Sequence, residues 1–453
     1  MQTLSLGAIA FVCLAGTADA ASGNGPSGAS ERIDALFAAT SGGRWPGAAV
    51  VVLRDGAVVH SRAYRLANVE QGLPNTPRTR FRLASVSKSF TALLVLQLVE
   101  QGRLHLGDPL EKHLPGVVGG DVMTIHHLLS HTAGMPDFTS FEEAAKLPRE
   151  YAPGKRLNYS NLGYSALARV IEKVTGKTYE ALLREGILDP LGMKDSGCDW
   201  RGASPDSRAT GYLFDPAVGG PVLAEHTDAD LASGGIYSTA EDMARWVKGL
   251  SDGRIVKAAT REKAWTPVVL GDGRRGAYGY GFMLVPYRGL REVAHGGDIS
   301  GFNSYVAIYP TESLAVVVLS NVGMRPPGPV PEAATIAHEV ADAMVGERLG
   351  PRWPPTVALA PRVLNQYVGR YRIDAPPPVV AVMGEVIEIR RDAERLIAKG
   401  KQGEAEIFPE SETEFHSKAG PVRISFVPGV DGRPAQAILT LLGLREFHLT
   451  RLP

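Results

Sequence analysis

Cysteine is almost absent from this sequence: its 453 residues contain only two, Cys13 and Cys198. Cys13 lies in an apolar segment, residues 4–16, that is followed by the small residues Ala-Asp-Ala ending at Ala20. This order is typical of a secretory signal peptide, so we predict one at residues 1–20. Its removal would leave Cys198 as the sole cysteine. A single cysteine excludes an internal disulfide, and an exported protein without disulfides fits the bacterial periplasm or exterior.

An excess of charge of either sign is also absent. The 48 Lys and Arg residues balance 48 Asp and Glu residues, and no stripe of basic residues is interleaved with aromatics. Binding to a polyanion requires such a surface, so we expect no nucleic-acid partner. After the N-terminal segment, no apolar run is long and uncharged enough to span a bilayer. We therefore expect no transmembrane segment once the signal peptide is removed.

The length of the chain predicts more than one domain, because single cores stop growing at about 250–300 residues. Residues 21–30 are small and polar, which is typical of a flexible spacer. Residues 31–347 carry strand patterns first, helical patterns next and strand patterns last. This order predicts a mixed α/β (α+β) domain, with an antiparallel sheet built from both chain ends and a helical lobe between them. A Pro-rich linker at 348–361 then leads to residues 362–453, whose short strands predict a small all-β barrel or sandwich without a convincing helix.

Local patterns predict the main elements of the first domain. An Asp55-Gly56 turn inside residues 47–67 predicts a hairpin. Helical spacing and caps predict helices at residues 31–40, 124–130, 162–175, 178–187 and 331–345 and one that opens at Thr239. Alternation predicts successive strands at residues 278–286, 291–295, 302–309 and 314–320.

Ser85 and Lys88 stand three residues apart at the start of an apolar run rich in Leu and Ala, residues 91–99. Residues three apart share a face of a helix, so the hydroxyl and the amine would lie side by side. The run is apolar on nearly every face, which predicts a buried helix, and burial pushes a lysine towards its neutral form. A serine beside such a lysine is an activated nucleophile. This is the only Ser-x-x-Lys in the chain.

Two later segments could complete such a site. Tyr159 and Asn161 precede a predicted helix, where a phenol could share a proton with the lysine and an amide could orient a carbonyl substrate. The segment His295-Gly296-Gly297-Asp298 ends a predicted strand. Its glycines would leave the strand edge open for a substrate, with backbone N–H groups towards a carbonyl oxygen and the imidazole at the mouth of that edge.

In this order the three motifs resemble those of the serine β-lactamase and penicillin-binding-protein superfamily, which are Ser-x-x-Lys, Tyr-x-Asn or Ser-x-Asn, and Lys-Thr-Gly or His-x-Gly. Further stretches resemble its class-C-like branch: LLSHTAGM at 128–135, YSNLGY at 159–164, GGIYSTAED at 234–242 and GGDISGF at 296–302. The resemblance covers residues 31 to 345. The C-terminal all-β domain resembles the lipocalin-like appendage of some members.

The resemblance implies a role for each motif residue. Ser85 would be acylated, Lys88 would hold or take its proton, and Tyr159 would act with Lys88 as general base and then general acid. Asn161, His295, Gly296, Gly297 and Asp298 would bind the substrate. The oxyanion hole would consist of the N–H groups of Ser85 and Asp298. No metal or cofactor would be needed.

The chain departs from the family pattern where His295 and Gly296 replace the Lys and Thr of efficient class C β-lactamases. This weakens carboxylate binding there and favours an exported serine hydrolase of esters, amides or peptides with D-residues, with weak β-lactamase activity as a further option. One alternative is a D-Ala-D-Ala carboxypeptidase or a class C β-lactamase. Another is a non-catalytic binding or structural protein.

Three other types of site are not supported by the sequence. No Gly-x-Ser-x-Gly elbow is present, which excludes an α/β-hydrolase site of that type. Gly176-Lys177-Thr178 is similar to the end of a P-loop, but Ile171 stands where its first Gly is required. The clustered histidines at 126, 127 and 131 have no neighbouring Cys or acid in the sequence, so a structural role is favoured over zinc binding.

Overall fold

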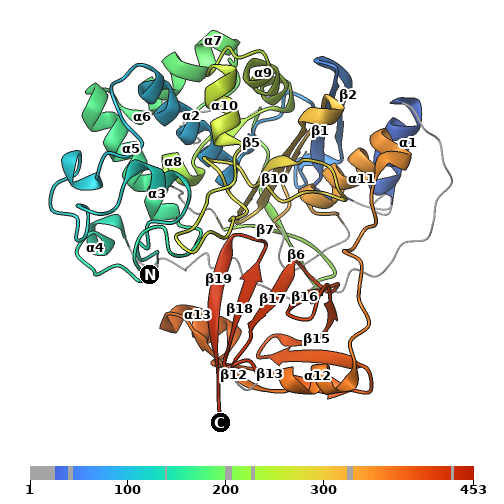
Figure 1. Ribbon diagram of the computed structural model, residues 1–453. Coiled ribbons are helices and arrows are strands. Elements are labelled where there is room, and N and C mark those ends of the chain that lie inside the picture. The colour runs from blue at the N-terminus through green and yellow to red at the C-terminus, as the bar shows by residue number, and fades with distance from the viewer. Residues whose placement is uncertain are drawn as a thin grey trace. The chain divides into compact units, whose positions relative to one another are not determined.

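The computed structural model describes residues 26–38, 44–137, 140–198, 207–225, 230–323, 330–429 and 433–453 (Figure 1). The predicted signal peptide lies outside these residues. The described chain divides into two compact units. The larger unit contains the described residues of Ser22–Lys155 and Ser160–Leu349, and the smaller one contains Arg156–Tyr159 and Gly350–Pro453.

The larger unit is built on a five-stranded antiparallel sheet with the order β2-β1-β11-β10-β9. Its strands are β1 (Ala48–Arg54), β2 (Ala57–Tyr64), β9 (Val293–Ile299), β10 (Phe302–Tyr309) and β11 (Leu314–Ser320). The first strand pairs with the last, from Ala48 opposite Ser320 to Arg54 opposite Leu314. The predicted union of the two chain ends in one sheet is confirmed, and with it the α/β (α+β) class.

Helices cover both faces of this sheet, so β10 and β11 are buried along their whole length. On one face, α11 (Ala333–Val345) packs against β10 and β11 and against α1 (Pro26–Leu36). On the other face, α9 (Ala240–Ser251) contacts β1 and β11. The near-continuous Val, Ala and Leu content of these strands follows from this two-sided burial.

The helical lobe follows the predicted capping signals closely. Thr178 and Thr239 cap α6 and α9 through hydrogen bonds to the N–H groups of Ala181 and Asp242. Gly176 ends α5 in the left-handed region at φ 74°. The helices of the lobe are α2 (Ser87–Glu100), α3 (Ile125–Leu129), α4 (Phe141–Ala144), α5 (Asn161–Thr175), α6 (Tyr179–Leu183), the π-helical η4 (Arg184–Leu188), α7 (Asp189–Leu191), α8 (Leu231–Gly234) and α10 (Ala258–Ala264).

Short elements connect the sheet and the lobe. They are the strands β3 (Leu66–Asn68), β4 (Leu73–Pro74), β5 (Phe81–Arg82), β6 (Tyr212–Asp215), β7 (Gly220–Leu223) and β8 (Tyr237–Ser238), and the 3₁₀ turns η2 (Ala84–Val86), η3 (Leu110–Lys112), η6 (Pro310–Glu312) and η7 (Gly346–Arg348). β5 pairs with β8 and leads directly into η2 and α2.

Two local predictions in the larger unit are wrong. α1 begins at Pro26, so residues 26–30 of the predicted spacer are helical; proline is well accommodated in a first helical turn, and Ile33 and Phe37 anchor the segment in the core. Residues 278–286 form isolated bridges instead of a strand. Gly281 lies there at φ 79°, and a Cβ on it would approach the carbonyl oxygen of Lys88 to 3.0 Å. A tight turn against α2 therefore replaces the extended strand.

The smaller unit is a closed barrel in which each strand pairs with the next and β12 pairs with β19. Its strands are β12 (Gly369–Asp374), β13 (Val386–Asp392), β14 (Arg395–Gly400), β15 (Gly403–Pro409), β16 (Glu414–Ser417), β17 (Val422–Val427), β18 (Gln436–Leu441) and β19 (Arg445–Arg451). The predicted all-β architecture is confirmed. The expectation of no helix is wrong, since α12 (Pro361–Tyr367) and α13 (Pro377–Met383) each begin at a proline.

The smaller unit also includes a segment distant in sequence. Asn158 bridges to Arg445 of β19, and the main-chain N–H of Tyr159 donates to the carbonyl of Leu444 at 3.0 Å. Edge pairing of this kind depends on tertiary structure and leaves no sequence signature. Among the helices described in both units, none has the length and apolar character needed to cross a bilayer.

Candidate active site

Ser85 lies on η2, the 3₁₀ turn that precedes α2. The residue before the turn is held at both main-chain groups: the Leu83 N–H donates to the Ile236 carbonyl at 2.8 Å, and the Ser304 hydroxyl donates to the Leu83 carbonyl at 2.6 Å. Ala84 has a φ of 47°, in the left-handed region that non-glycine residues seldom adopt. These contacts hold Ser85, the predicted nucleophile, on a strained and fixed turn.

Lys88 lies one turn further on, on α2, and is completely buried. Its Nζ lies 3.2 Å from the Ser85 Oγ, 2.8 Å from the Asn161 Oδ1 and 2.7 Å from the carbonyl oxygen of Ser233 on α8. The amide and the main-chain carbonyl oxygens can only accept hydrogen bonds, whereas a serine hydroxyl can also donate. A neutral amine would therefore give its two N–H groups to Asn161 and Ser233 and direct its lone pair at the Ser85 hydroxyl.

Burial also favours that neutral form. It lowers the pKa of Lys88 to about 7 from its ordinary value of 10.5, although the carboxylates of Asp137 and Asp230 act to raise it. A substantial fraction of Lys88 is thus unprotonated near neutral pH. The arrangement has two features typical of an activated serine, a hydrogen-bonded amine and an amine pKa of about 7.

Asn161 is the first residue of α5, and its position follows from the cap of that helix. The Ser160 Oγ accepts from the Gly163 N–H at 3.1 Å, and the Ser160 N–H donates to the His131 Nδ1 at 3.1 Å. Asp137 Oδ1 accepts from the Ser160 hydroxyl and from the Leu162 N–H. The Asn161 side chain is thereby presented to Lys88.

Tyr159 is half-buried and immediately precedes this cap. Besides the bond to Leu444, its carbonyl accepts from the Arg445 guanidinium at 2.8 Å within the smaller unit. These contacts fix its main chain. The role of its hydroxyl as a partner of Lys88 stays a prediction.

The predicted substrate strand is β9, whose glycines serve different purposes. Gly297 pairs with Ser304 of β10 and lies against the nucleophile turn, where a Cβ would stand 2.1 Å from the Leu83 carbonyl oxygen and 3.1 Å from the Ala84 Cβ. Gly296 faces the other side, towards the Tyr305 ring. Asp298 follows as an exposed residue. The strand and η2 are therefore in van der Waals contact through Gly297, which brings two of the three motifs together.

His295 differs from the sequence expectation of an imidazole at an open mouth, because it is only 2% exposed. Its Nδ1 donates to the Gly296 carbonyl at 2.7 Å, since a carbonyl can only accept, and its Nε2 then accepts from the Tyr278 hydroxyl at 2.9 Å. Burial, together with the charge of Lys88, lowers the pKa of His295 to about 3. The ring is therefore neutral and shapes the strand without contributing a positive charge.

The three clustered histidines each bond to a protein group. His126 Nδ1 bonds to the Tyr280 hydroxyl at 2.8 Å, His127 completes a capping box with Thr124, and His131 holds the Ser160 N–H. Within the described ranges, no group of three His, Cys, Asp or Glu side chains is arranged to hold a metal.

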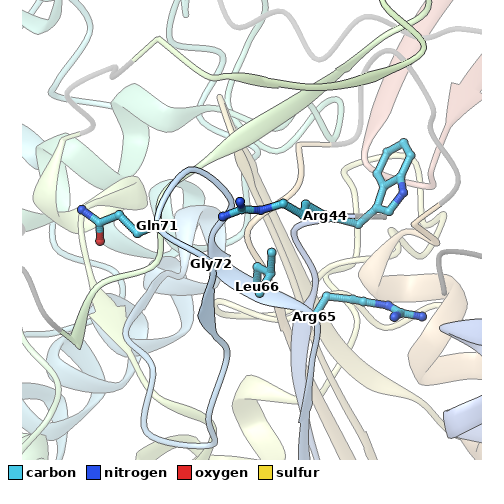
Figure 2. A pocket seen from close by; sticks show the side chains of 6 residues that line it. Arg44, Arg65, Leu66, Gln71 and Gly72 are labelled. Atoms are coloured by element: carbon cyan, nitrogen blue, oxygen red, sulfur yellow. The ribbon is translucent and has the colours of Figure 1, made fainter. Parts of the chain in front are cut away.

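A separate pocket of about 590 Å³ lies in the larger unit. Figure 2 shows the side chains around it, and none of the predicted site residues is among them. Its lining consists of Arg44, Trp45, Arg65, Leu66, Gln71 and Gly72.

A family model described as Beta-lactamase matches residues 33–341, well over half of the chain. The chain belongs to the Beta-lactamase family. This places it in the serine β-lactamase and penicillin-binding-protein superfamily of serine hydrolases, as its motifs predicted. Penicillin-binding protein 4* of Bacillus subtilis is 28% identical over 426 residues, which cover 84% of this chain and 90% of that protein.

Solved structures of similar fold agree with this membership. The octameric penicillin-binding protein homologue from Pyrococcus abyssi is 25% identical with a TM-score of 0.64, over 94% of this chain and 99% of that one. The D-amino acid amidase of Ochrobactrum anthropi SV3 is 22% identical with a TM-score of 0.59, over 71% of this chain and 99% of that one. At that identity the amidase supports the fold alone.

Sequence reasoning missed several residues of this Beta-lactamase-family site. Ser233 contributes a main-chain carbonyl, to which side-chain identity gives no clue. Tyr278 and Asp137 act through partners at least 17 residues away in the sequence. The single sequence contains no local pattern that links Tyr278 or Asp137 to these partners.

Proposed function

We propose that this protein is a serine hydrolase that cleaves ester or amide bonds through a covalent acyl-enzyme at Ser85. The observation that carries the proposal is the buried Lys88 Nζ, 3.2 Å from the Ser85 Oγ and with a pKa of about 7. An amine in this state accepts the hydroxyl proton at neutral pH without a further activating group.

Acylation would begin with attack of the Ser85 Oγ on the substrate carbonyl carbon while the hydroxyl proton moves to Lys88. The carbonyl oxygen would take up negative charge and be stabilised by the N–H groups of Ser85 and Asp298. The bond to the leaving alcohol or amine would then break as Lys88, with Tyr159, returns the proton to the leaving group. Water would attack the acyl-enzyme by the same proton path and release the acid and free Ser85.

Asn161 would have two tasks in this scheme. Its Oδ1 accepts from Lys88, which keeps one amine proton away from Ser85. Its NH₂ group would be left to donate to a substrate carbonyl. Gly296 and Gly297 would leave the edge of β9 free for the substrate chain.

The electrostatics of β9 favour esters, amides and D-amino-acid peptides over substrates recognised by a free carboxylate. A neutral, buried His295 supplies no cation to such a carboxylate. The same observation disfavours efficient class C β-lactamase or D-Ala-D-Ala carboxypeptidase activity, which remains the second candidate because of the similarity to a penicillin-binding protein. A weak β-lactamase activity is compatible with either.

We further propose that the protein is exported through a signal peptide at residues 1–20 and acts in the periplasm or outside the cell. The proposed catalytic scheme needs neither metal nor cofactor. The test of location is the N-terminal sequence of the protein recovered from a bacterial periplasmic or culture fraction, which should begin at Ala21.

Reaction with a fluorophosphonate probe and with labelled penicillin tests the catalytic proposal. Mass spectrometry should locate the label on Ser85, and Ser85→Ala should remain unlabelled. Hydrolysis of p-nitrophenyl acetate, nitrocefin and D-Ala-D-Ala peptides by both proteins then separates the candidates. Faster turnover of the ester supports the leading proposal, faster turnover of nitrocefin or release of D-Ala supports the second, and an unmodified Ser85 supports a non-catalytic binding protein.

A further inference from the structure

Asp137 lies beside the first turn of α5 and bonds to the residues that flank Asn161. It comes from the segment after α3, six residues beyond His131, and it is half-buried. One carboxylate oxygen, Oδ1, accepts from the Ser160 hydroxyl at 3.1 Å and from the Leu162 N–H at 2.9 Å. Both donors belong to the first turn of α5.

These two hydrogen bonds provide an acceptor for N–H and O–H donors at the start of α5. The first N–H groups of a helix have no partner within it. In α5, Gly163 finds its acceptor in the Ser160 hydroxyl, and Leu162 finds its acceptor in Asp137. The carboxylate also lies at the positive end of the helix dipole. Asp137 therefore contacts the residues on either side of Asn161.

We propose that Asp137 is a positioning residue: it fixes the first turn of α5 so that the Asn161 Oδ1 meets the Lys88 amine, and its charge acts on that amine. The inference rests on the proposed function of Ser85 and Lys88. Asp137 does not touch the reacting atoms in this scheme and acts through Asn161 and through space.

The charge of Asp137 opposes the effect of burial on Lys88. Its carboxylate raises the pKa of the amine, and so does that of Asp230, which caps α8 through the Ala232 and Ser233 N–H groups. Among the described groups near the amine, the buried His295 has a pKa of about 3 and is neutral near neutral pH, and the uncharged Tyr164 ring lies 5.8 Å from Nζ. Asp137 and Asp230 together thus hold the pKa of Lys88 near 7 against desolvation.

Two substitutions separate positioning from charge. Asp137→Asn keeps an oxygen that can accept both hydrogen bonds but removes the charge. Asp137→Ala removes both. Thr178→Ala is the matched control, because it deletes the cap of another helix, α6, without approaching Lys88. Thermal unfolding of each variant reports whether the fold is retained.

The readout is the rate at which a fluorophosphonate labels Ser85, measured from pH 5 to 9. For Asp137→Asn we expect the plateau rate to stay within about threefold of the wild type, while the acid limb moves to lower pH by up to about 1 unit, because the Lys88 pKa falls further. For Asp137→Ala we expect the same shift and a plateau lowered by about 10- to 100-fold, the cost of a misplaced catalytic group. Thr178→Ala should leave the profile unchanged.

Wild-type labelling rates in Asp137→Ala would overturn the inference, as would an acid limb in Asp137→Asn that coincides with the wild type. Both results presuppose that Ser85 is labelled, so they contradict the role of Asp137 and leave the proposed function intact. Failure of the proposed function looks different, because the wild type itself would then leave Ser85 unlabelled.

Discussion

Gly297 lies so close to Leu83 that no side chain fits between them: a Cβ on Gly297 would stand 2.1 Å from the Leu83 carbonyl oxygen and 2.4 Å from the Ser304 Oγ that donates to it. The strand that we expect to bind the substrate and the turn that carries Ser85 therefore share one packed boundary. A shift at either side moves the other.

Replacing Gly297 with Ala should accordingly disrupt the nucleophile turn. The added methyl group must push Leu83 or Ser304 away. We expect this to lower the free energy of unfolding by about 1–3 kcal/mol and to abolish nearly all labelling of Ser85. Gly107→Ala is the control, because a Cβ on Gly107 would meet no atom within 4 Å. Equal loss of labelling in both variants would contradict this reading.

Lys88 should be irreplaceable as the base. Lys88→Arg retains a positive charge that no accessible pH removes, and Lys88→Met removes the amine. Both should reduce the rate of Ser85 labelling by about 10²–10⁴, the usual contribution of a general base. Lys248→Met, a change at an exposed lysine, should have no effect. Substantial labelling of Ser85 in Lys88→Met would assign the base elsewhere.

Activity of the wild type should rise with pH through about 7. In the proposed scheme the base is the neutral amine, and the pKa of Lys88 is about 7, so the protonated and inactive form would dominate below that value. The rate of Ser85 labelling from pH 5 to 9 should show a single acid limb near pH 7. A rate that does not change over this range would show that titration of Lys88 does not control the reaction.

Acid should destabilise the fold partly through His295. The pKa of this ring is 6.5 in its ordinary state and about 3 when folded, so between these values the unfolded chain binds more protons than the native one. Stability must therefore fall as the pH drops from about 6.5 to 3, by about 1.4 kcal/mol per pH unit at most for this group.

Chemical unfolding of His295→Gln between pH 3 and 7 checks this expectation. The variant should lose less stability on acidification than the wild type. Tyr278→Phe removes the hydroxyl that donates to the neutral His295 ring. The folded-state pKa of His295 should then rise, so stability should fall over a narrower pH range. An identical pH dependence in His295→Gln and the wild type would exclude His295 as a source of acid lability.

Local chemistry explains what the sequence alone could predict. The Ser85–Lys88 spacing, the threonine caps of α6 and α9 and the Asp55-Gly56 turn each act within a few residues, so they are visible in the chain. The burial of Lys88 was also predictable, because the helix that carries it is apolar on nearly every face.

Features that depend on distant partners were not predictable. His295 is neutral because its ring is buried near the charge of Lys88, far away in the sequence. Its hydroxyl partner Tyr278 lies 17 residues earlier, in a segment whose alternation suggested a strand but which Gly281 turns against α2. The two hydrogen bonds of Asp137 reach 23 and 25 residues along the chain. The pairing of Arg156–Tyr159 with the barrel unit spans nearly 300 residues. Composition and periodicity depend on neighbouring residues, so they do not predict contacts between residues far apart in the sequence.

The acceptors that direct the lone pair of Lys88 come from residues 73 and 145 positions further along the chain. In an unfolded chain Ser85 and Lys88 are still neighbours, but the amine is hydrated, cationic and unable to take a proton. Reactivity thus arises only when α5 and α8 have docked on α2. In the proposed scheme a newly made chain would therefore be inactive until its tertiary structure is complete, and folding itself would be the step that activates it.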